Sequence, residues 1–111
     1  MTDLTKLTIT EALKGLKEKK FSAVELTKEY LNKMESCREL NAYVLETPEK
    51  ALEQAKAADE KYKNGTNGAL EGIPLGIKDL FCTRGIRTTA CSHILDGFVP
   101  PYESTVTQKP V

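Results

Sequence analysis

The chain has 111 residues, enough for one modest domain with its own core. Its 16 basic and 16 acidic residues cancel, so no net charge attracts nucleic acid or an anionic membrane to it. No apolar run approaches the roughly 18 residues of a membrane span, and the first residues lack the pattern of an export signal. Three widely spaced cysteines favour reduced thiols over a disulfide framework. We therefore expect a cytoplasmic protein without a membrane partner.

Charge density divides the chain into two parts. Residues 1–63 carry 24 charged side chains, whereas residues 64–111 carry only 8. We interpret residues 1–63 as a helical N-terminal segment with one short strand, and residues 64–111 as the beginning of a buried core. Together they would form a single, incomplete domain.

Two capping boxes, TITE at 8–11 and SAVE at 22–25, predict the starts of two helices. Phe21 and Leu26 add a hydrophobic staple to the second helix. Apolar positions recur at helical spacing and should face inward: Ile9, Ala12, Leu13 and Leu16, then Ala23, Leu26, Tyr30, Leu31 and Met34. Gly15 weakens the first helix slightly. Pro48 at a first helical position predicts a third helix, with small alanines at 51, 55 and 58 on one side.

The rest of the chain indicates short strands and turns. Residues 41–46 (NAYVLE) have strand character. After the turn-rich loop NGTNG at 64–68, the apolar run at 73–77 is too short and too rich in glycine and proline for a helix, so it predicts a buried strand. Beyond it we expect a turn at 83–85, a short helix capped by Ser92 and a last helix from near Ser104. The fold class is therefore α/β.

Lys78 follows the predicted strand and stands among apolar neighbours: Ile73, Leu75, Ile77, Leu80 and Phe81. We expect its ammonium to be partly desolvated, which disfavours the charged form and makes lysine a usable base near neutral pH. The plainer alternative is a lysine that extends from the edge of the core, or one paired with Asp79 or Asp96. The hydroxyls of residues 88–92 (TTACS) could orient this ammonium, although Ser92 has the simpler role of a helix cap.

Other chemical candidates are weaker. Cys82, Cys91 and His93 offer neither a C-x₂-C pair nor a fourth ligand, so we expect no zinc site. Cys91 and His93 are too close in sequence to converge as a nucleophile pair in a strand, though a turn could bring them together. No glycine-rich phosphate loop is present. Lys78 is thus the candidate catalytic residue, and no cofactor or metal site is expected in this chain.

Longer motifs resemble the amidase signature family. They are GIPLGIKD at 72–79, T-x-G at 83–85, TTA at 88–90, S-x-I-L at 92–95 and F-x-P-x-YESTV at 98–106, with SAVEL at 22–26 and NAY at 41–43. Within that family the chain is most similar to the A subunits of glutamyl-tRNA(Gln)/aspartyl-tRNA(Asn) amidotransferases. The resemblance implies N-terminal helices followed by the first strands of a mixed sheet, so that residues 64–111 would begin the amidase core.

The family acts through a Ser-cis-Ser-Lys triad, and the resemblance assigns Lys78 as its lysine. Such a lysine accepts a proton through a bridging serine, so that a second serine can attack an amide carbonyl. The serines of this chain are Ser22, Ser36, Ser92 and Ser104, and none lies in a Gly-Ser-Ser stretch. We therefore expect an N-terminal fragment that is inactive by itself, with both catalytic serines downstream.

By the same resemblance, the substrate is glutamine, and its ammonia passes to a B subunit that uses ATP and Mg²⁺ to amidate mischarged glutamyl-tRNA. A small C subunit would bind between the other two. Two other interpretations share part of this pattern. A stand-alone amide hydrolase would use Lys78 without tRNA or partner subunits. A non-enzymatic module would bind a partner through its first three helices.

Overall fold

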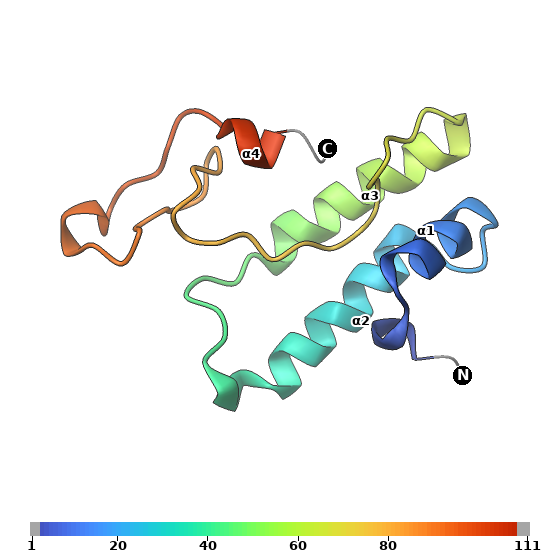
Figure 1. Ribbon diagram of the computed structural model, residues 1–111, viewed down its shortest axis with the longest axis horizontal. Helices are drawn as coiled ribbons and strands as arrows, with labels where there is room; N and C mark the ends of the chain where they lie inside the picture. Colours follow the sequence, from blue (N-terminus) through green and yellow to red (C-terminus); the bar gives the residue numbers. More distant parts are fainter. Residues whose placement is uncertain (1–2, 109–111) are drawn as a thin grey trace. The chain divides into compact units, whose positions relative to one another are not determined.

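The computed structural model describes residues 3–108 (Figure 1). These residues form four α-helices and three 3₁₀ helices: η1 (Leu4–Lys6), α1 (Ile9–Lys17), α2 (Ala23–Ser36), η2 (Arg38–Leu40), α3 (Pro48–Asn64), η3 (His93–Leu95) and α4 (Thr105–Gln108). The chain divides into two compact units, one up to Pro74 and one from Leu75 onward. We call them the helical unit and the loop unit. None of the helices in the described range has the length and apolar character needed to cross a membrane.

Both predicted capping boxes lie at helix starts; the box at 8–11 forms with both of its hydrogen bonds, and the box at 22–25 forms with the hydrogen bond to Ser22. The Thr8 hydroxyl accepts a hydrogen bond from the Glu11 N–H at 3.2 Å, and the Glu11 carboxylate accepts one from the Thr8 N–H at 3.1 Å. At α2 the Ser22 hydroxyl accepts from the Glu25 N–H at 3.1 Å. These side chains satisfy N–H groups that have no partner within the helix. The predictions of α1 and α2 are confirmed.

The third predicted helix is also confirmed. Pro48 occupies the first turn of α3, where its missing N–H is not needed. The helix ends at Asn64, and Gly65 follows with φ of 72°, a left-handed conformation that glycine adopts without strain. The turn signals at 64–68 therefore end the helix where the sequence indicates.

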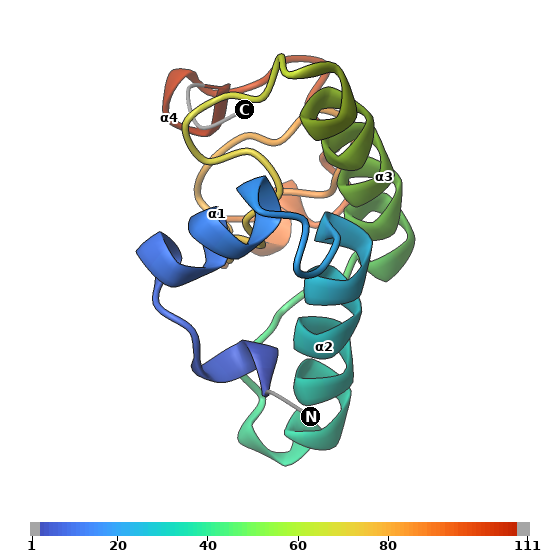
Figure 2. The same ribbon diagram turned by 90° about the vertical axis from the view of Figure 1, so that its right-hand side faces the viewer.

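The core of the helical unit is small and rich in alanine. It consists of Ala12, Leu16, Ala23, Leu26, Ala55 and Ala58. Figures 1 and 2 both show α2 alongside α3, and the two alanines on the buried face of α3 permit this close approach. Two positions predicted to face inward, Ile9 and Tyr30, are exposed, while Thr27 is buried. Ile9 is the first residue of α1, and Tyr30 lies one turn beyond Leu26, the last apolar residue buried in α2. Helical periodicity therefore indicates which face is apolar but not how far along each helix the core extends.

Gly15 has a packing role that helix propensity does not reveal. It is buried in α1, and a Cβ built on it would overlap the aromatic ring of Phe21. The absence of a side chain therefore lets Phe21 pack against the helix, where it joins the hydrophobic core. This packing offsets the lower intrinsic helix propensity of glycine.

The segment that leaves the helical unit is fastened to α3. The Tyr62 hydroxyl donates to the main-chain carbonyl of Glu71 at 2.8 Å, and the Lys61 ammonium lies 3.2 Å from the buried Glu71 carboxylate. Burial, together with the nearby Glu71 charge, raises the pKa of Tyr62. Gly72, with φ of 82°, follows in a space bounded by Leu16, Ala23 and the Tyr62 ring. The chain is therefore well fixed just before the loop unit begins.

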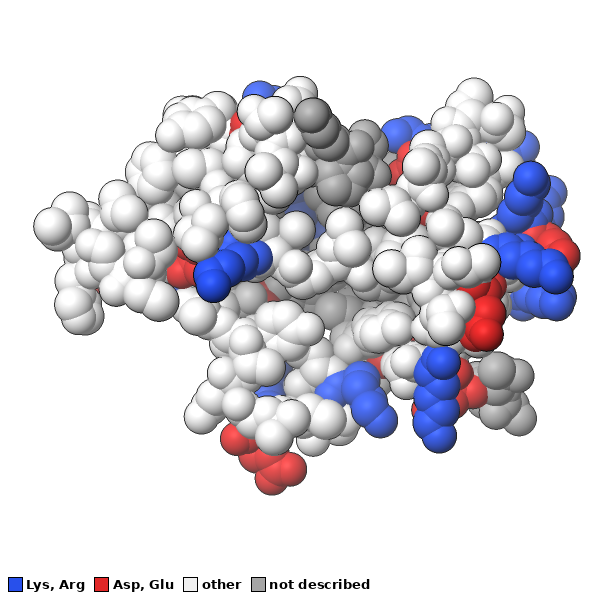
Figure 3. All heavy atoms as spheres, viewed as in Figure 1, with Lys and Arg blue, Asp and Glu red and all other residues white. Residues whose placement is uncertain are grey.

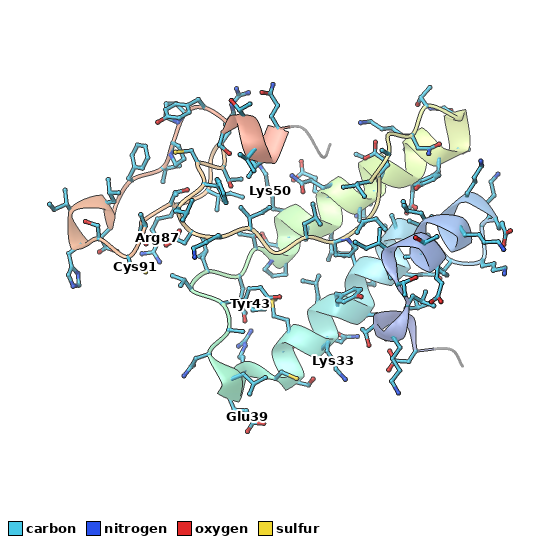
Figure 4. The ribbon with its side chains drawn as sticks, in the orientation of Figure 1. Lys33, Glu39, Tyr43, Lys50, Arg87 and Cys91 are labelled. Atoms are coloured by element: carbon cyan, nitrogen blue, oxygen red, sulfur yellow. The ribbon has the colours of Figure 1, made fainter. Side chains whose placement is uncertain are left out.

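The strand predictions fail in the described residues. Residues 41–46 and 73–77 are irregular, and the described part of the chain holds one isolated antiparallel bridge, between Thr83 and Ile86. A strand forms only when a neighbour takes up its backbone hydrogen bonds, and no segment within 3–108 pairs with these two. The α/β class is thus not confirmed: the regular structure here is helical. Tyr43 lies instead in the open connection between α2 and α3 (Figure 4).

The apolar run before Lys78 is also less buried than predicted. Ile73 packs against the helical core, but the side chains of Leu75 and Ile77 are 49% and 47% exposed.

The charged residues are concentrated in the helical unit, as the charge density of residues 1–63 predicts. Figure 3 shows many of the Lys, Arg, Asp and Glu side chains over the end of the helical unit that holds α1.

Candidate active-site loop around Lys78

Lys78 begins a tight turn in the loop unit. Its main-chain carbonyl accepts a hydrogen bond from the Phe81 N–H at 3.1 Å. The Lys78 side chain is exposed, as are those of Ile77 and Leu80. The predicted desolvation is therefore wrong for this structure, because apolar neighbours exclude water from an ammonium only when they are packed over it. The ammonium is accessible to any group that approaches it.

Neither of the carboxylates considered as partners of Lys78 is paired with it. Asp96 forms an ion pair with Arg87, with 2.9 Å between Nη1 and Oδ1; Arg87 is labelled in Figure 4. The Asp79 carboxylate is engaged by Thr89. Within residues 3–108, the ion pairs present do not include Lys78.

Asp79 joins the Lys78 turn to a segment ten residues further on. Its Oδ1 accepts from the Thr89 N–H at 3.1 Å, and its Oδ2 accepts from the Thr89 hydroxyl. Its main-chain carbonyl accepts from the Ala90 N–H at 2.9 Å. The hydrogen bond from the Thr89 hydroxyl, followed by that from the Thr89 N–H, lowers the pKa of Asp79. Three hydrogen bonds therefore hold the residue adjacent to Lys78.

The segment that Asp79 contacts is an unusual turn. Ala90 and Cys91 have φ of 47° and 61°, left-handed values that are costly for residues with a Cβ. The Ser92 N–H donates to the Thr89 carbonyl at 2.8 Å and closes the turn. The Ser92 hydroxyl then accepts from the Ile94 N–H at 3.2 Å, which confirms its predicted role as a cap. The hydroxyls of this segment thus serve the backbone and Asp79, and the Lys78 ammonium is not among their described partners.

Further hydrogen bonds close the loop unit. The Cys82 carbonyl accepts from the Ser104 N–H at 2.8 Å, and the Glu103 carboxylate accepts from the Arg84 N–H at 3.0 Å. A second oxygen of Glu103 accepts from the Thr107 hydroxyl. The turn predicted at 83–85 is confirmed, because the Ile86 N–H donates to the Thr83 carbonyl at 3.0 Å. Lys78 therefore belongs to loops whose order depends on specific polar contacts.

The remaining sequence candidates do not assemble a site. Cys82 is half-buried and its thiol lies 3.8 Å from the Tyr102 hydroxyl. Cys91 is exposed (Figure 4), and so is His93. Across the described residues, no three His, Cys, Asp or Glu side chains are grouped as metal ligands would be. Each serine has a local role: Ser22 and Ser92 cap helices, Ser36 donates to the Lys33 carbonyl and Ser104 contacts the Thr107 hydroxyl.

Comparison with known proteins identifies the chain. Residues 25–109 match the family described as Amidase. The chain belongs to the amidase family. The resemblance drawn from the motifs between residues 22 and 106 is thereby confirmed.

Within the amidase family, the curated relatives most similar to the chain include A subunits of glutamyl-tRNA(Gln) amidotransferases. The amidase chain is 63% identical over 108 residues to the A subunit of the glutamyl-tRNA(Gln) amidotransferase of Hyphomonas neptunium, an alignment that covers 97% of the chain and 22% of the relative. It is 63% identical over 107 residues to the protein of the same name from Xanthobacter autotrophicus, and 56% identical over 109 residues to that from Paramagnetospirillum magneticum. These alignments cover 96% and 98% of the chain, and 22% of each relative. This amidase chain thus spans less than a quarter of the length of its curated relatives.

Proposed function

We propose that this chain is the N-terminal part of the glutamine-hydrolysing subunit of a tRNA-dependent amidotransferase. The observation that carries the proposal is the 63% identity to the A subunit of a glutamyl-tRNA(Gln) amidotransferase along 97% of the chain. That alignment leaves only a few residues of the chain outside it, so the motif that contains Lys78 falls within the aligned segment. Hydrolysis of glutamine would supply ammonia to convert glutamyl-tRNA(Gln) into glutaminyl-tRNA(Gln).

In the proposed chemistry, Lys78 is the general base. It accepts a proton from a bridging serine, which in turn takes the proton of a second serine whose oxygen attacks the carboxamide carbon of glutamine. When the tetrahedral intermediate collapses, the C–N bond breaks and the proton returns to the leaving nitrogen as ammonia forms. Water then hydrolyses the acyl-serine to glutamate.

Two features of the structure are compatible with this role. The Lys78 side chain is exposed, so a serine-bearing segment can reach it. The four serines of the chain take part in helix caps or other local hydrogen bonds, and none is bonded to Lys78 among the described contacts. We therefore place the bridging and nucleophilic serines in the remainder of the full-length protein.

The partners follow from the same proposal. A B subunit would use ATP and Mg²⁺ to activate the glutamyl group of the mischarged tRNA, and a C subunit would bind between it and the amidase. The cytoplasm, where aminoacylated tRNA is used, would be the site of action. The chain itself would bind no metal or nucleotide.

The test is a glutaminase assay on the full-length protein that carries this segment, in its complex. Replacing Lys78 by Ala or Arg should lower kcat by about 10³-fold or more, because loss of one member of such a triad removes nearly all of its contribution and arginine cannot serve as a base. Arg84→Ala is the matched control: it removes an exposed cation from the same unit and should leave kcat unchanged. The isolated 111-residue chain should show only background turnover.

The same measurements separate the alternatives. Full activity after Lys78→Ala would refute the catalytic role and favour an interaction module. Substantial Lys78-dependent activity of the isolated chain would contradict the assignment of the serines to other segments. A stand-alone amide hydrolase would hydrolyse amides without B and C subunits, and those subunits would not copurify with it.

A further inference from the structure

The residue that follows Lys78 has a structural task of its own. We infer that Asp79 is a positioning residue that sets the place of Lys78 by fastening its turn to Thr89. This inference rests on the proposed function of Lys78. It concerns a residue that acts through another and does not itself touch the substrate.

Lys78 is held by its backbone and not by its side chain. The Lys78 ammonium forms none of the ion pairs within the described range, and the side chain is exposed. The position of the Lys78 Cα, from which the side chain extends, is therefore fixed by the neighbouring peptide groups. Asp79 supplies this restraint with both its carboxylate and its main-chain carbonyl, bonded to Thr89 and Ala90.

The other end of the connection between Asp79 and Thr89 is rigid. Thr88 and Thr89 are only 5% and 8% exposed, although each carries a polar hydroxyl. Asp79 bonds to this buried segment just where the backbone enters the left-handed conformations of Ala90 and Cys91. Such conformations persist only where surrounding contacts enforce them. Asp79 thus stabilises a strained turn, and the turn in return fixes the position of Asp79.

A carboxylate at position 79 matches both donors of Thr89. One oxygen of Asp79 accepts the Thr89 N–H while the other accepts the Thr89 hydroxyl. An ionised carboxylate accepts at both oxygens, whereas an amide accepts at only one. The same two hydrogen bonds lower the pKa of Asp79, so it remains an acceptor throughout the neutral range. The two donors of Thr89 are therefore matched by aspartate and not by asparagine at position 79.

The experiment measures glutaminase kinetics and thermal stability of the full-length protein, in its complex, for four single variants and one double variant. Asp79→Ala and Thr89→Val each remove part of the connection and should lower kcat by about 10- to 100-fold, because a misplacement of about 1 Å in a catalytic group has effects of this size. KM for glutamine should remain within about twofold, since the substrate contacts are unchanged. Thr89→Ser retains the hydroxyl and should restore most of kcat.

Thr88→Val is the matched control. It removes a neighbouring buried hydroxyl, bonded to the Ile86 carbonyl at 3.2 Å, and should leave kcat unchanged even if it lowers Tm. The double variant Asp79→Ala/Thr89→Val should lose little more than either single variant, because both remove the same connection. If Asp79→Ala or Thr89→Val fails to fold, Asp79→Asn takes its place, because its amide retains only one acceptor oxygen. It should still lower kcat, and a normal kcat would overturn the positioning role.

The outcomes distinguish the two proposals. If Lys78→Ala abolishes activity while Asp79→Ala and Thr89→Val keep normal kcat, the positioning role is overturned and the proposed function stands. Equal losses in Thr89→Val and Thr88→Val would also overturn it, since a general loss of stability would then explain both. If Lys78→Ala is fully active, the proposed function itself fails.

Discussion

Asp59 on α3 caps helix α2, because its carboxylate accepts hydrogen bonds from the main-chain N–H groups of Ala23 at 2.6 Å and of Val24 at 3.2 Å. Ser22 accepts the next N–H, that of Glu25. The first three N–H groups of α2 are thus satisfied by two side chains, one local and one from another helix. A negative charge at this position also interacts favourably with the helix dipole.

Replacing Asp59 by Ala should therefore lower the free energy of unfolding by about 1–2 kcal/mol. Asp59→Asn should cost less, because its amide oxygen still accepts one N–H. Urea denaturation of the full-length protein that carries this segment, followed by far-UV circular dichroism, measures both. Glu53→Ala removes an exposed carboxylate from the same helix and should change the free energy by less than about 0.5 kcal/mol. Equal effects of Asp59→Ala and Glu53→Ala would contradict the interhelical cap.

Gly72→Ala should destabilise the helical unit by about 1–3 kcal/mol. The new Cβ would lie 3.1 Å from the Ala23 Cβ and 3.2 Å from the Leu16 Cδ1, on a backbone with φ of 82°. Gly65→Ala isolates the backbone contribution, since Gly65 has φ of 72° but no atom within 4 Å of the added carbon. We expect it to cost only about 1 kcal/mol. If the two variants melt at the same temperature, packing around Gly72 does not matter.

The Asp79–Thr89 connection should depend on pH in the acid range. Because the pKa of Asp79 is lowered by folding, its stabilising effect is fully present above the ordinary carboxyl value near 4 and is lost as pH falls through the lowered pKa. NMR titration of the Thr89 and Ala90 amide protons should report this transition. Thr89→Val should raise the pKa of Asp79 toward its ordinary value. An unchanged titration midpoint in that variant would show that Thr89 is not the cause.

The isolated chain should associate at micromolar concentrations or be only marginally stable. Its loop unit exposes several large apolar side chains, among them Leu75, Ile77 and Ile94, the last 94% exposed. Sedimentation velocity over a range of concentrations measures the association. Ile94→Lys should reduce it, while Thr10→Lys, which adds the same charge on α1, should not. A monomer that melts sharply at low concentration would count against this expectation.

Local signals in the sequence were sufficient for the helices and insufficient for the strands. Thr8, Ser22 and Pro48 act within one turn of chain, so each helix start could be predicted from adjacent residues. A strand depends on a partner elsewhere, and residues 73–77 have none in the described range. The burial predicted around them failed for the same reason.

The candidate site, like the strands, depends on a partner distant in sequence that local signals do not reveal. The GIPLGIKD motif singled out Lys78, but the sequence offered Asp79 only as its ion partner. The actual partner, Thr89, lies ten residues away and begins a turn whose left-handed residues, Ala90 and Cys91, are not glycines. Residue types that usually signal such a turn were absent, so the connection could not be predicted. The hydroxyl-rich run at 88–92 was the one available hint.

The interhelical cap has a consequence for synthesis of the protein. Two sets of contacts stabilise the helical unit: Asp59 with the N–H groups of α2, and Tyr62 with Glu71. None of these residues lies beyond residue 71. All the residues that make these contacts have left the ribosome once Glu71 has emerged. Domains generally fold from the N-terminus during synthesis. The helical unit can therefore be in place on the ribosome before the residues around Lys78 emerge.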